Sequence, residues 1–388
     1  MSRLSLLASH LSPSLGHVGR SRNARVFWDL AGPAVRGLLL KRGKRSAKST
    51  IPANNRARFD WEYEREKPEL SRLYEAAKRS QWASGDLDWS TEVDPHCEAR
   101  LLLPDSLLPL ESLRSYRNLP RRRQLDQTHA LTAWLLSQFL HGEQGALFAA
   151  CQVTEAVEWT DGKLYGSTQV VDEGRHVEVF HRYLSDKLSK LYKINDNLYT
   201  IIDALMTDGR WDLKFLGMQI MVEGLALGAF GTMRQATQEP LLKELLKRVI
   251  TDEARHVHFG VVVLRDLYAA LPESERRDRE DWAYEITVLM RNRFLAHEFY
   301  DEYYAHQMSQ RQWDKIVLAS PFMQHFRETM FRRMIPNLRR IHLLTDRIAP
   351  HYAALGLLRF AEGRSADEVA PGDLLEMDPD DAERLLLR

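Results

Sequence analysis

Two similar pentapeptides carry the residues of this chain that are best suited to bind metal ions. They are DEGRH at 172–176 and DEARH at 252–256, and each holds a glutamate and a histidine three residues apart. On a helix this spacing places both side chains on one face, one turn apart. A carboxylate and an imidazole placed in this way can bind one metal ion. The sequence therefore predicts two metal-binding helices, one with Glu173 and His176 and the other with Glu253 and His256.

A single glutamate precedes each pentapeptide within an otherwise apolar stretch. Glu143 lies in LSQFLHGEQGALFAAC and Glu223 in FLGMQIMVEGLALGAF, at positions where the helical pattern predicts a leucine. Each lies 30 residues before the glutamate of the next pentapeptide, and the whole set recurs with an offset of 80 residues. Because these residues repeat while the sequence around them does not, the repeat indicates chemistry rather than packing.

An aspartate and an arginine accompany each glutamate–histidine pair. Asp172 and Asp252 precede the glutamates, and Arg175 and Arg255 precede the histidines. We expect each aspartate to accept the outer N–H of a metal-bound histidine, either on its own helix or across the bundle. The arginines are expected to hold the aspartates in place.

Four long helices must position these residues. The hydrophobic pattern predicts them over about 125–158, 164–191, 211–236 and 241–271. Residues equally far from a short turn lie level on two antiparallel helices, so each hairpin brings two glutamates and one histidine to one depth. Two hairpins packed face to face then gather four carboxylates and two imidazoles. The predicted fold class is all-α, with a ferritin-like four-helix bundle core and additional N- and C-terminal helices.

Four carboxylates in one core require bound cations, because burying each ion costs several kcal/mol even after relaxation. Their four negative charges balance two divalent ions. Oxygen ligands with one imidazole per ion suit iron or manganese better than a metal that prefers thiolates. We therefore expect two iron ions, with iron plus manganese as an alternative. The expected ligands are Glu143, Glu173, His176, Glu223, Glu253 and His256.

The regions that flank the four helices are predicted from composition and helix breakers. Residues 1–58 are basic and are interpreted as a partly disordered tail, with membrane-surface contact or an organelle-targeting peptide as alternatives. Residues 59–124 are expected to hold one amphipathic helix, at about 60–80, followed by connectors. Residues 272–360 are expected to form helices packed on the bundle, and 361–388 a loosely held acidic tail.

Composition narrows the classes of partner and cofactor. Lys plus Arg and Asp plus Glu each total 54, so bulk charge does not indicate a nucleic-acid partner. The two cysteines, Cys97 and Cys151, are too few for a disulfide framework or a CxxC metal site, and they suit a reducing cytoplasm. No apolar run is expected to reach the length of a membrane span. We therefore expect a cytoplasmic protein.

The doubled D-E-x-R-H motif, with its two preceding glutamates, resembles the ferritin-like di-iron carboxylate superfamily. The resemblance covers about residues 125–270 and is strongest to the oxygen-activating branch. That branch includes bacterial multicomponent monooxygenase hydroxylases, acyl-carrier-protein desaturases, ribonucleotide reductase small subunits and ligand-binding oxidases. The resemblance implies that the six residues bind two irons and that the reduced pair activates dioxygen to oxidise an organic substrate.

Positions that distinguish these branches match none of them fully. Phe180 stands where the reductase small subunits have their radical tyrosine, and Met218 where the ligand-binding oxidases have a tyrosine. Leu227 and Ala226 stand where the hydroxylases and the desaturases, respectively, have a threonine. The resemblance therefore implies a diverged oxygenase or oxidase. Small residues on the third helix leave room for a mainly apolar substrate, in a pocket lined by Phe180, Ala226, Leu227 and Phe230.

The leading interpretation is a dioxygen-dependent di-iron monooxygenase or oxidase that hydroxylates a small organic molecule. Fatty-acyl desaturation and N-oxygenation are alternatives within the same chemistry, and a ferroxidase or iron-handling protein is an alternative of another class. Such an oxygenase needs two external electrons per turnover, so we expect a reductase or ferredoxin as partner. The resemblance also implies a homodimer, and no nucleic-acid partner is expected.

Overall fold

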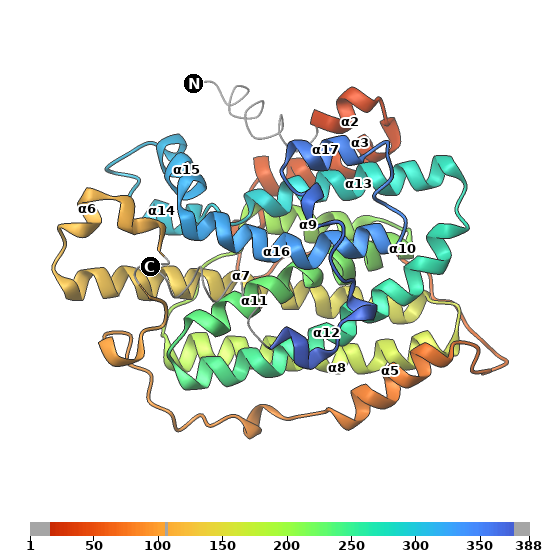
Figure 1. Ribbon diagram of the computed structural model, residues 1–388, viewed down its shortest axis with the longest axis horizontal. Coiled ribbons are helices and arrows are strands. Elements are labelled where there is room, and N and C mark those ends of the chain that lie inside the picture. Colours follow the sequence, from red (N-terminus) through yellow and green to blue (C-terminus); the bar gives the residue numbers. More distant parts are fainter. Residues whose placement is uncertain (1–15, 105–107, 376–388) are drawn as a thin grey trace.

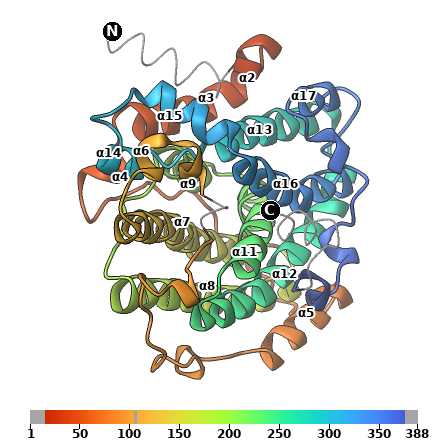
Figure 2. The same cartoon turned by 60° about the vertical axis from the view of Figure 1, so that its left-hand side comes forward.

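The computed structural model describes residues 16–104 and 108–375 of the chain, and within them the regular structure is entirely helical. Four stretches of helix form the central bundle (Figure 1). Figure 2 shows α7 and α8 on one side of the bundle and α11 and α12 on the other. These helices are α7 (Arg121–Ala156), α8 (Thr160–Arg182), α11 (Gly224–Ala236) and α12 (Pro240–Ala269).

Three of the four predicted helices are confirmed, with ends that differ by a few residues. Helix α7 begins directly after Pro120, which cannot donate a backbone hydrogen bond inside a helix. Helix α12 begins with Pro240 at its first position, and the Glu239 carboxylate caps it by accepting from the amides of Leu241 and Leu242. Helix α8 ends at Arg182 and continues as a short π-helix, η6 (Tyr183–Lys187).

The third helix of the bundle is not a regular α-helix. It starts as α10 (Trp211–Phe215), continues as an eight-residue π-helix, η7 (Leu216–Glu223), and becomes α11. Glu223 is the last residue of the π segment, so the wider turns decide where its side chain points. The hydrophobic pattern predicts only a continuous helix here, because it does not distinguish i→i+4 from i→i+5 hydrogen bonding.

This third helix corrects the expectation about apolar runs. The segment Trp211–Ala236 is long enough to span a membrane, with a mean hydropathy of 1.4 in its most apolar window. Within the structure, however, 94% of that window is buried. A helix that is apolar on all sides belongs in a membrane or in the centre of a protein core, and this one lies between α12, α13 (Glu273–Asn292) and α16 (Pro321–Arg340).

The N-terminal basic segment is mostly helical over residues 16–45, which corrects the expected tail for that part, whereas residues 46–58 have no regular structure and are mostly exposed. Arg25 pairs with Asp278 at 3.1 Å, and Arg36 donates to Asp203 at 2.8 Å. Acidic side chains of other helices thus balance its basic charge, which composition cannot reveal. Residues 1–15 lie outside the described residues. The helices concerned are α2 (Gly16–Ser21), α3 (Ala24–Ala34), η1 (Val35–Leu39) and α4 (Arg42–Arg45), which lie against α9 (Asp196–Thr207) and α13.

The other flanks lie on the outside of the bundle. Helix α5 (Pro68–Arg79) is shorter than predicted, since Pro68 sets its start, and it packs on α8 and α12 (Figure 1). The acidic segment 361–375 is held by Asp367, which pairs with Arg340 at 2.8 Å and with Arg265 at 3.3 Å. This corrects the loosely held tail for that part, while 376–388 lie outside the described residues.

Helices α11 and α16 touch backbone to backbone at Gly228, so Gly228→Ala is expected to destabilise the protein. A Cβ there would lie 2.6 Å from the Met330 Cα and from the Thr329 carbonyl oxygen, and neither atom can turn aside. Such overpacking costs about 1–3 kcal/mol. A Cβ at Gly231, on the same helix, would meet nothing within 4 Å, so Gly231→Ala should instead stabilise the protein by up to about 1 kcal/mol. Urea unfolding of both variants checks this; equal effects would contradict the close contact.

Candidate metal centre

The six side chains expected to bind metal all lie together in the bundle core, and none is more than 5% exposed. Four separate helical segments contribute to this set, which matches the arrangement that the repeat of 80 residues predicts. Glu143 comes from α7, Glu173 and His176 from α8, Glu223 from η7, and Glu253 and His256 from α12.

Their ligand atoms form two overlapping groups, each able to hold a metal ion. One group contains Glu143 and His176, and the other contains Glu223 and His256. Glu173 and Glu253 belong to both groups, and the ligand atoms within a group lie within 4.8 Å of one another. The arrangement thus has two shared carboxylates in the middle and one carboxylate with one imidazole at each end.

Both imidazoles direct the Nδ1 atom toward the carboxylates. His176 Nδ1 lies 3.1 Å from Glu253 Oε1 and 3.4 Å from Glu143 Oε2. His256 Nδ1 lies 3.1 Å from Glu173 Oε1 and 3.3 Å from Glu253 Oε2. The two ends of the centre are therefore built alike, as the sequence repeat predicts.

Several carboxylate oxygens in this cluster lack any hydrogen-bond partner among the described residues. They are Glu173 Oε2, Glu223 Oε2 and Glu253 Oε1, all buried. His176 Nδ1 lies 3.1 Å from Glu253 Oε1, which is an ion-pair distance, but the two atoms form no hydrogen bond. A buried acceptor without a partner costs free energy, and such groups are rare in folded proteins. A cation between the carboxylates would satisfy these oxygens, and the set of oxygen and imidazole donors suits iron or manganese. The residues therefore fit a pair of such ions.

Burial and mutual repulsion perturb the pKa values of the terminal glutamates. Burial raises the pKa of Glu143 and of Glu223 well above the ordinary range, and the charge of Glu253 raises both further. Burial alone would lower the pKa of His176 and of His256, but their carboxylate neighbours raise both well above the usual value. In the metal-free protein these four side chains therefore keep their protons to a higher pH than ordinary glutamates and histidines do.

Each histidine is held from outside by an aspartate of the opposite helix. His176 Nε2 lies 3.2 Å from Asp252 Oδ2, and His256 Nε2 lies 3.2 Å from Asp172 Oδ2. The sequence left open whether these contacts form along a helix or across the bundle, and the structure has them across it. An aspartate in this position fixes the orientation and the tautomer of a ligand histidine.

Two arginines bridge the two aspartates. Arg175 pairs with Asp172 and lies 3.2 Å from Asp252, while Arg255 pairs with Asp252 and lies 3.7 Å from Asp172. The four charges sum to zero, so this buried cluster is electrostatically balanced without the metal site. The expected role of the arginines, to hold the aspartates, agrees with these contacts.

Two further contacts come from the connector after α5, and the sequence did not single them out. Gln81 Nε2 donates to Asp172 Oδ1 at 2.9 Å, and Trp82 Nε1 donates to Asp252 Oδ2 at 2.8 Å. The connector has no periodic pattern, so no signal marks these residues. A third missed residue, Gln169, donates to Glu223 Oε1 at 3.1 Å. It lies four residues before Glu173 on the ligand face, and that spacing could have revealed it.

Asp252→Ala is expected to weaken metal binding by about 10–100-fold, because His176 loses the acceptor of its outer N–H. Trp82→Phe removes only the indole N–H from the same carboxylate and should have a smaller effect. Competition with a chelator measures both affinities. Wild-type affinity for both ions in Asp252→Ala protein would contradict this role.

The residues of the predicted substrate pocket do not line either of the two cavities described for this structure. Phe180 and Phe230 are buried with ring centroids 5.8 Å apart, and Phe139 lies 4.7 Å from Phe230. Leu227 is also buried, whereas Ala226 is half-buried. Cavities of about 510 and 190 Å³ lie elsewhere, among other residues. The apolar pocket beside the metal centre therefore stays a prediction.

The sequence did not predict a buried arginine, Arg293, whose pKa is affected by the charge of Glu143. Arg293 follows α13 and is 3% exposed. Its Nη1 donates to the sulfur of Met290 at 3.7 Å, and its Nε has no partner among the described residues. Burial lowers the pKa of Arg293 to about 10, and Glu143 opposes that shift. This guanidinium has no acidic hydrogen-bond partner in the described part of the chain.

Comparisons with known proteins matched one family model and several solved structures. Residues 64–342 match the family model described as P-aminobenzoate N-oxygenase AurF. Among solved structures, dimanganese(II)-NrdF of Streptococcus sanguinis is similar over 82% of this chain and 99% of its own, with 11% identity and a TM-score of 0.50. An R2-like ligand-binding oxidase variant with a Mn/Fe cofactor has 19% identity and a TM-score of 0.43, over 74% and 96%. No curated protein sequence matches significantly. The NrdF likeness confirms the predicted fold class.

Proposed function

The chain belongs to the AurF family, and from that membership we propose that it inserts oxygen at the nitrogen of an amine that also carries a carboxylate. The chain is a dimetal oxidoreductase that activates dioxygen to oxidise an organic substrate. The family description favours N-oxygenation, one of the alternatives that the sequence left open, over hydroxylation of carbon. Iron storage or ferroxidase activity receives no support from this family.

The observation that carries the proposal is the pair of overlapping carboxylate–histidine groups. We propose that Glu143, Glu173, His176 and Glu253 would hold one ion, and that a second group would hold the other, namely Glu173, Glu223, Glu253 and His256. Two iron ions, or one iron and one manganese, supply the oxygen activation that side chains cannot. Asp172 and Asp252 hold the histidine rings in place, and burial keeps bulk water from the centre.

When the charges around the metal centre are summed, the guanidinium of Arg293 has no counter-charge among the described residues. Four glutamates with Asp172 and Asp252 carry six negative charges, and two divalent ions with Arg175 and Arg255 carry six positive ones. Arg293 is then a surplus buried cation, and an unpaired buried charge is costly. We propose that the carboxylate of the substrate pairs with Arg293 while its amine faces the metal pair. The proposed substrate is therefore mainly apolar, as expected, but carries one anionic group.

Oxidation of p-aminobenzoate under ¹⁸O₂ tests this function, with iron-loaded protein and an external reductant. One oxygen atom is expected on the nitrogen, while the other leaves as water with two electrons from the reductant. The Arg293→Met variant should lose about 30-fold or more in kcat/KM for p-aminobenzoate, since a buried charge pair is broken. Aniline, which lacks the carboxylate, should react equally with both proteins. Label on a ring carbon would contradict N-oxygenation, and equal loss with aniline would contradict the role of Arg293.

We further propose that an external reductase or ferredoxin delivers the electrons in a reducing cytoplasm. Cys97 and Cys151, both free thiols, suit that compartment. We also propose that the chain forms a homodimer.

A further inference from the structure

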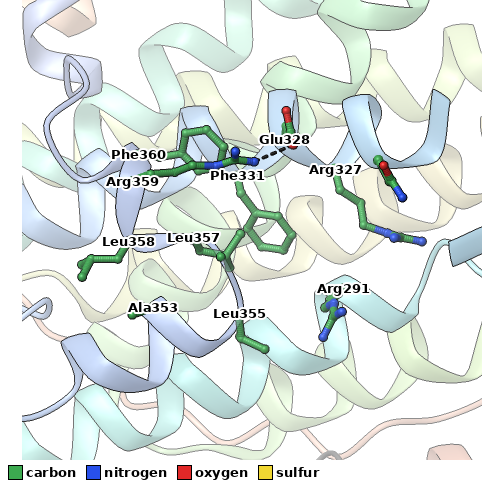
Figure 3. A pocket seen from close by; sticks show the side chains of 12 residues that line it. Arg291, Arg327, Glu328, Phe331, Ala353, Leu355, Leu357, Leu358, Arg359 and Phe360 are labelled. Carbon is green, nitrogen blue, oxygen red and sulfur yellow. Dashed lines mark hydrogen bonds and ion pairs between the residues drawn. The ribbon is translucent and has the colours of Figure 1, made fainter. Parts of the chain in front are cut away.

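A cavity of about 510 Å³ lies on the outside of α16, between the end of α13 and the turn that follows α17 (Ala349–Ala354). Figure 3 shows that its two sides differ in chemistry. The side chains of Arg291 and Arg327 lie on one side, and those of Leu357 and Leu358 lie on the other. The ring of Phe331 lies between them (Figure 3).

The two arginines have no acidic partner in the described part of the chain. Arg327 Nε and Nη2 are buried and make no hydrogen bond. Burial, together with the like charge of Arg291, lowers the pKa of Arg327 to about 10. A third arginine, Arg359, is different, because it is paired with Glu328 at 2.5 Å (Figure 3). Two cations that repel each other therefore border one cavity without a counter-charge of their own among the described residues.

We propose that this cavity binds an organic carboxylate with an apolar body, at a site separate from the metal centre. A carboxylate between the two guanidinium groups would satisfy the free N–H donors of Arg327 and relieve the repulsion. The leucine and phenylalanine side chains would cover the apolar part. A volume of about 510 Å³ lies within the usual range for small-molecule sites.

The proposed ligand needs both its carboxylate and its apolar body to fit this cavity. A neutral apolar molecule would leave the Arg327 guanidinium buried and unpaired, and an inorganic anion would leave the apolar wall in contact with water. The site shares no residue with the carboxylate–histidine cluster. Helix α16 nevertheless connects the two regions, because its Met330 touches α11 at Gly228 while Phe331 lines the cavity.

Calorimetric titration of the metal-loaded full chain with octanoate tests the proposal. Octanoate is expected to bind at least about tenfold more tightly than either 1-octanol or inorganic phosphate. Arg327→Gln and Arg291→Gln should each weaken octanoate binding by about 10–100-fold, since each removes one partner of the bound anion. Arg72→Gln is the matched control: Arg72 lies on α5, at the opposite edge of the molecule from α17 (Figure 1), and the variant should bind octanoate as wild type does.

Two measurements keep the proposal falsifiable. Arg327→Gln removes a half-buried cation whose Nε and Nη2 make no hydrogen bond, so its melting temperature should be no lower than that of wild type. Arg291→Gln changes an exposed side chain and serves if the first variant does not fold. Wild-type octanoate affinity in Arg291→Gln would overturn the proposal, because binding would then lie elsewhere, for instance at the metal centre. Equal affinity for octanoate and octanol, or for octanoate and phosphate, would overturn the ligand class.

Discussion

Replacing Glu173 with alanine is expected to remove both metal ions, whereas replacing Glu143 with alanine is expected to leave about one per chain. Glu173 belongs to both carboxylate–histidine groups, so its loss takes one ligand from each ion. Glu143 belongs to one group only, and the group of Glu223 and His256 keeps all four of its residues. Elemental analysis of desalted protein measures the ions per chain.

The matched control for this experiment is Glu178→Ala, which removes an exposed carboxylate from the same helix as Glu173. It should retain two ions per chain. Glu223→Ala should behave like Glu143→Ala, because the two ends of the centre are built alike. If Glu143→Ala protein lost both ions as completely as Glu173→Ala protein, the sharing of Glu173 and Glu253 would be wrong.

Loading the metal-free protein with two divalent ions at neutral pH is expected to release protons, up to four per chain. Burial and the charge of Glu253 raise the pKa of Glu143 and of Glu223, so both carboxyls keep their protons to a higher pH than ordinary glutamates do. Carboxylate neighbours outweigh burial and raise the pKa of His176 and of His256, so both rings also keep their protons to a higher pH than ordinary histidines do. Each of the four groups must lose its proton to bind metal, and the affinity should therefore fall as the pH falls.

The same shifts fix how the stability of the metal-free protein depends on pH. All four pKa values are higher in the folded state than in the unfolded state. Protonation of these groups therefore stabilises the folded state in full at a pH below their unfolded pKa values. This stabilisation is lost as the pH rises through their folded pKa values. Metal-free protein should therefore become less stable as the pH rises above neutral. Titration in two buffers of different ionisation enthalpy counts the protons. Release of less than about one proton, together with unchanged stability, would contradict this account.

The repeat in the sequence was sufficient to predict the bundle and the six side chains that lie together in its core, because helical spacing converts residue numbers into positions on a face. Glu143 and Glu223 could be recognised since each interrupts an apolar stripe. The direction of the contacts from Asp172 and Asp252 could not be predicted, because it depends on how α8 and α12 pack across the bundle.

The remaining contacts depend on parts of the chain that are remote in sequence and carry no periodic signal. Gln81 and Trp82 reach the aspartates from an irregular connector, and Arg36 meets Asp203 only after the N-terminal helices have packed. The π-helix that ends at Glu223 has the same residue pattern as an α-helix. Arg293 is a single cation in an arginine-rich region, and only its burial distinguishes it.

Dioxygen uptake by reduced, iron-loaded protein tests the central claim most directly, namely that this chain activates dioxygen at a two-metal centre. Wild-type protein that holds two ferrous ions per chain is compared with Glu253→Ala protein in the same iron solution. We predict uptake that is rapid, that rises in proportion to the chains holding two ions, and that is lost in the variant. Uptake by wild type no faster than that of the variant, with two ions bound, would contradict the claim.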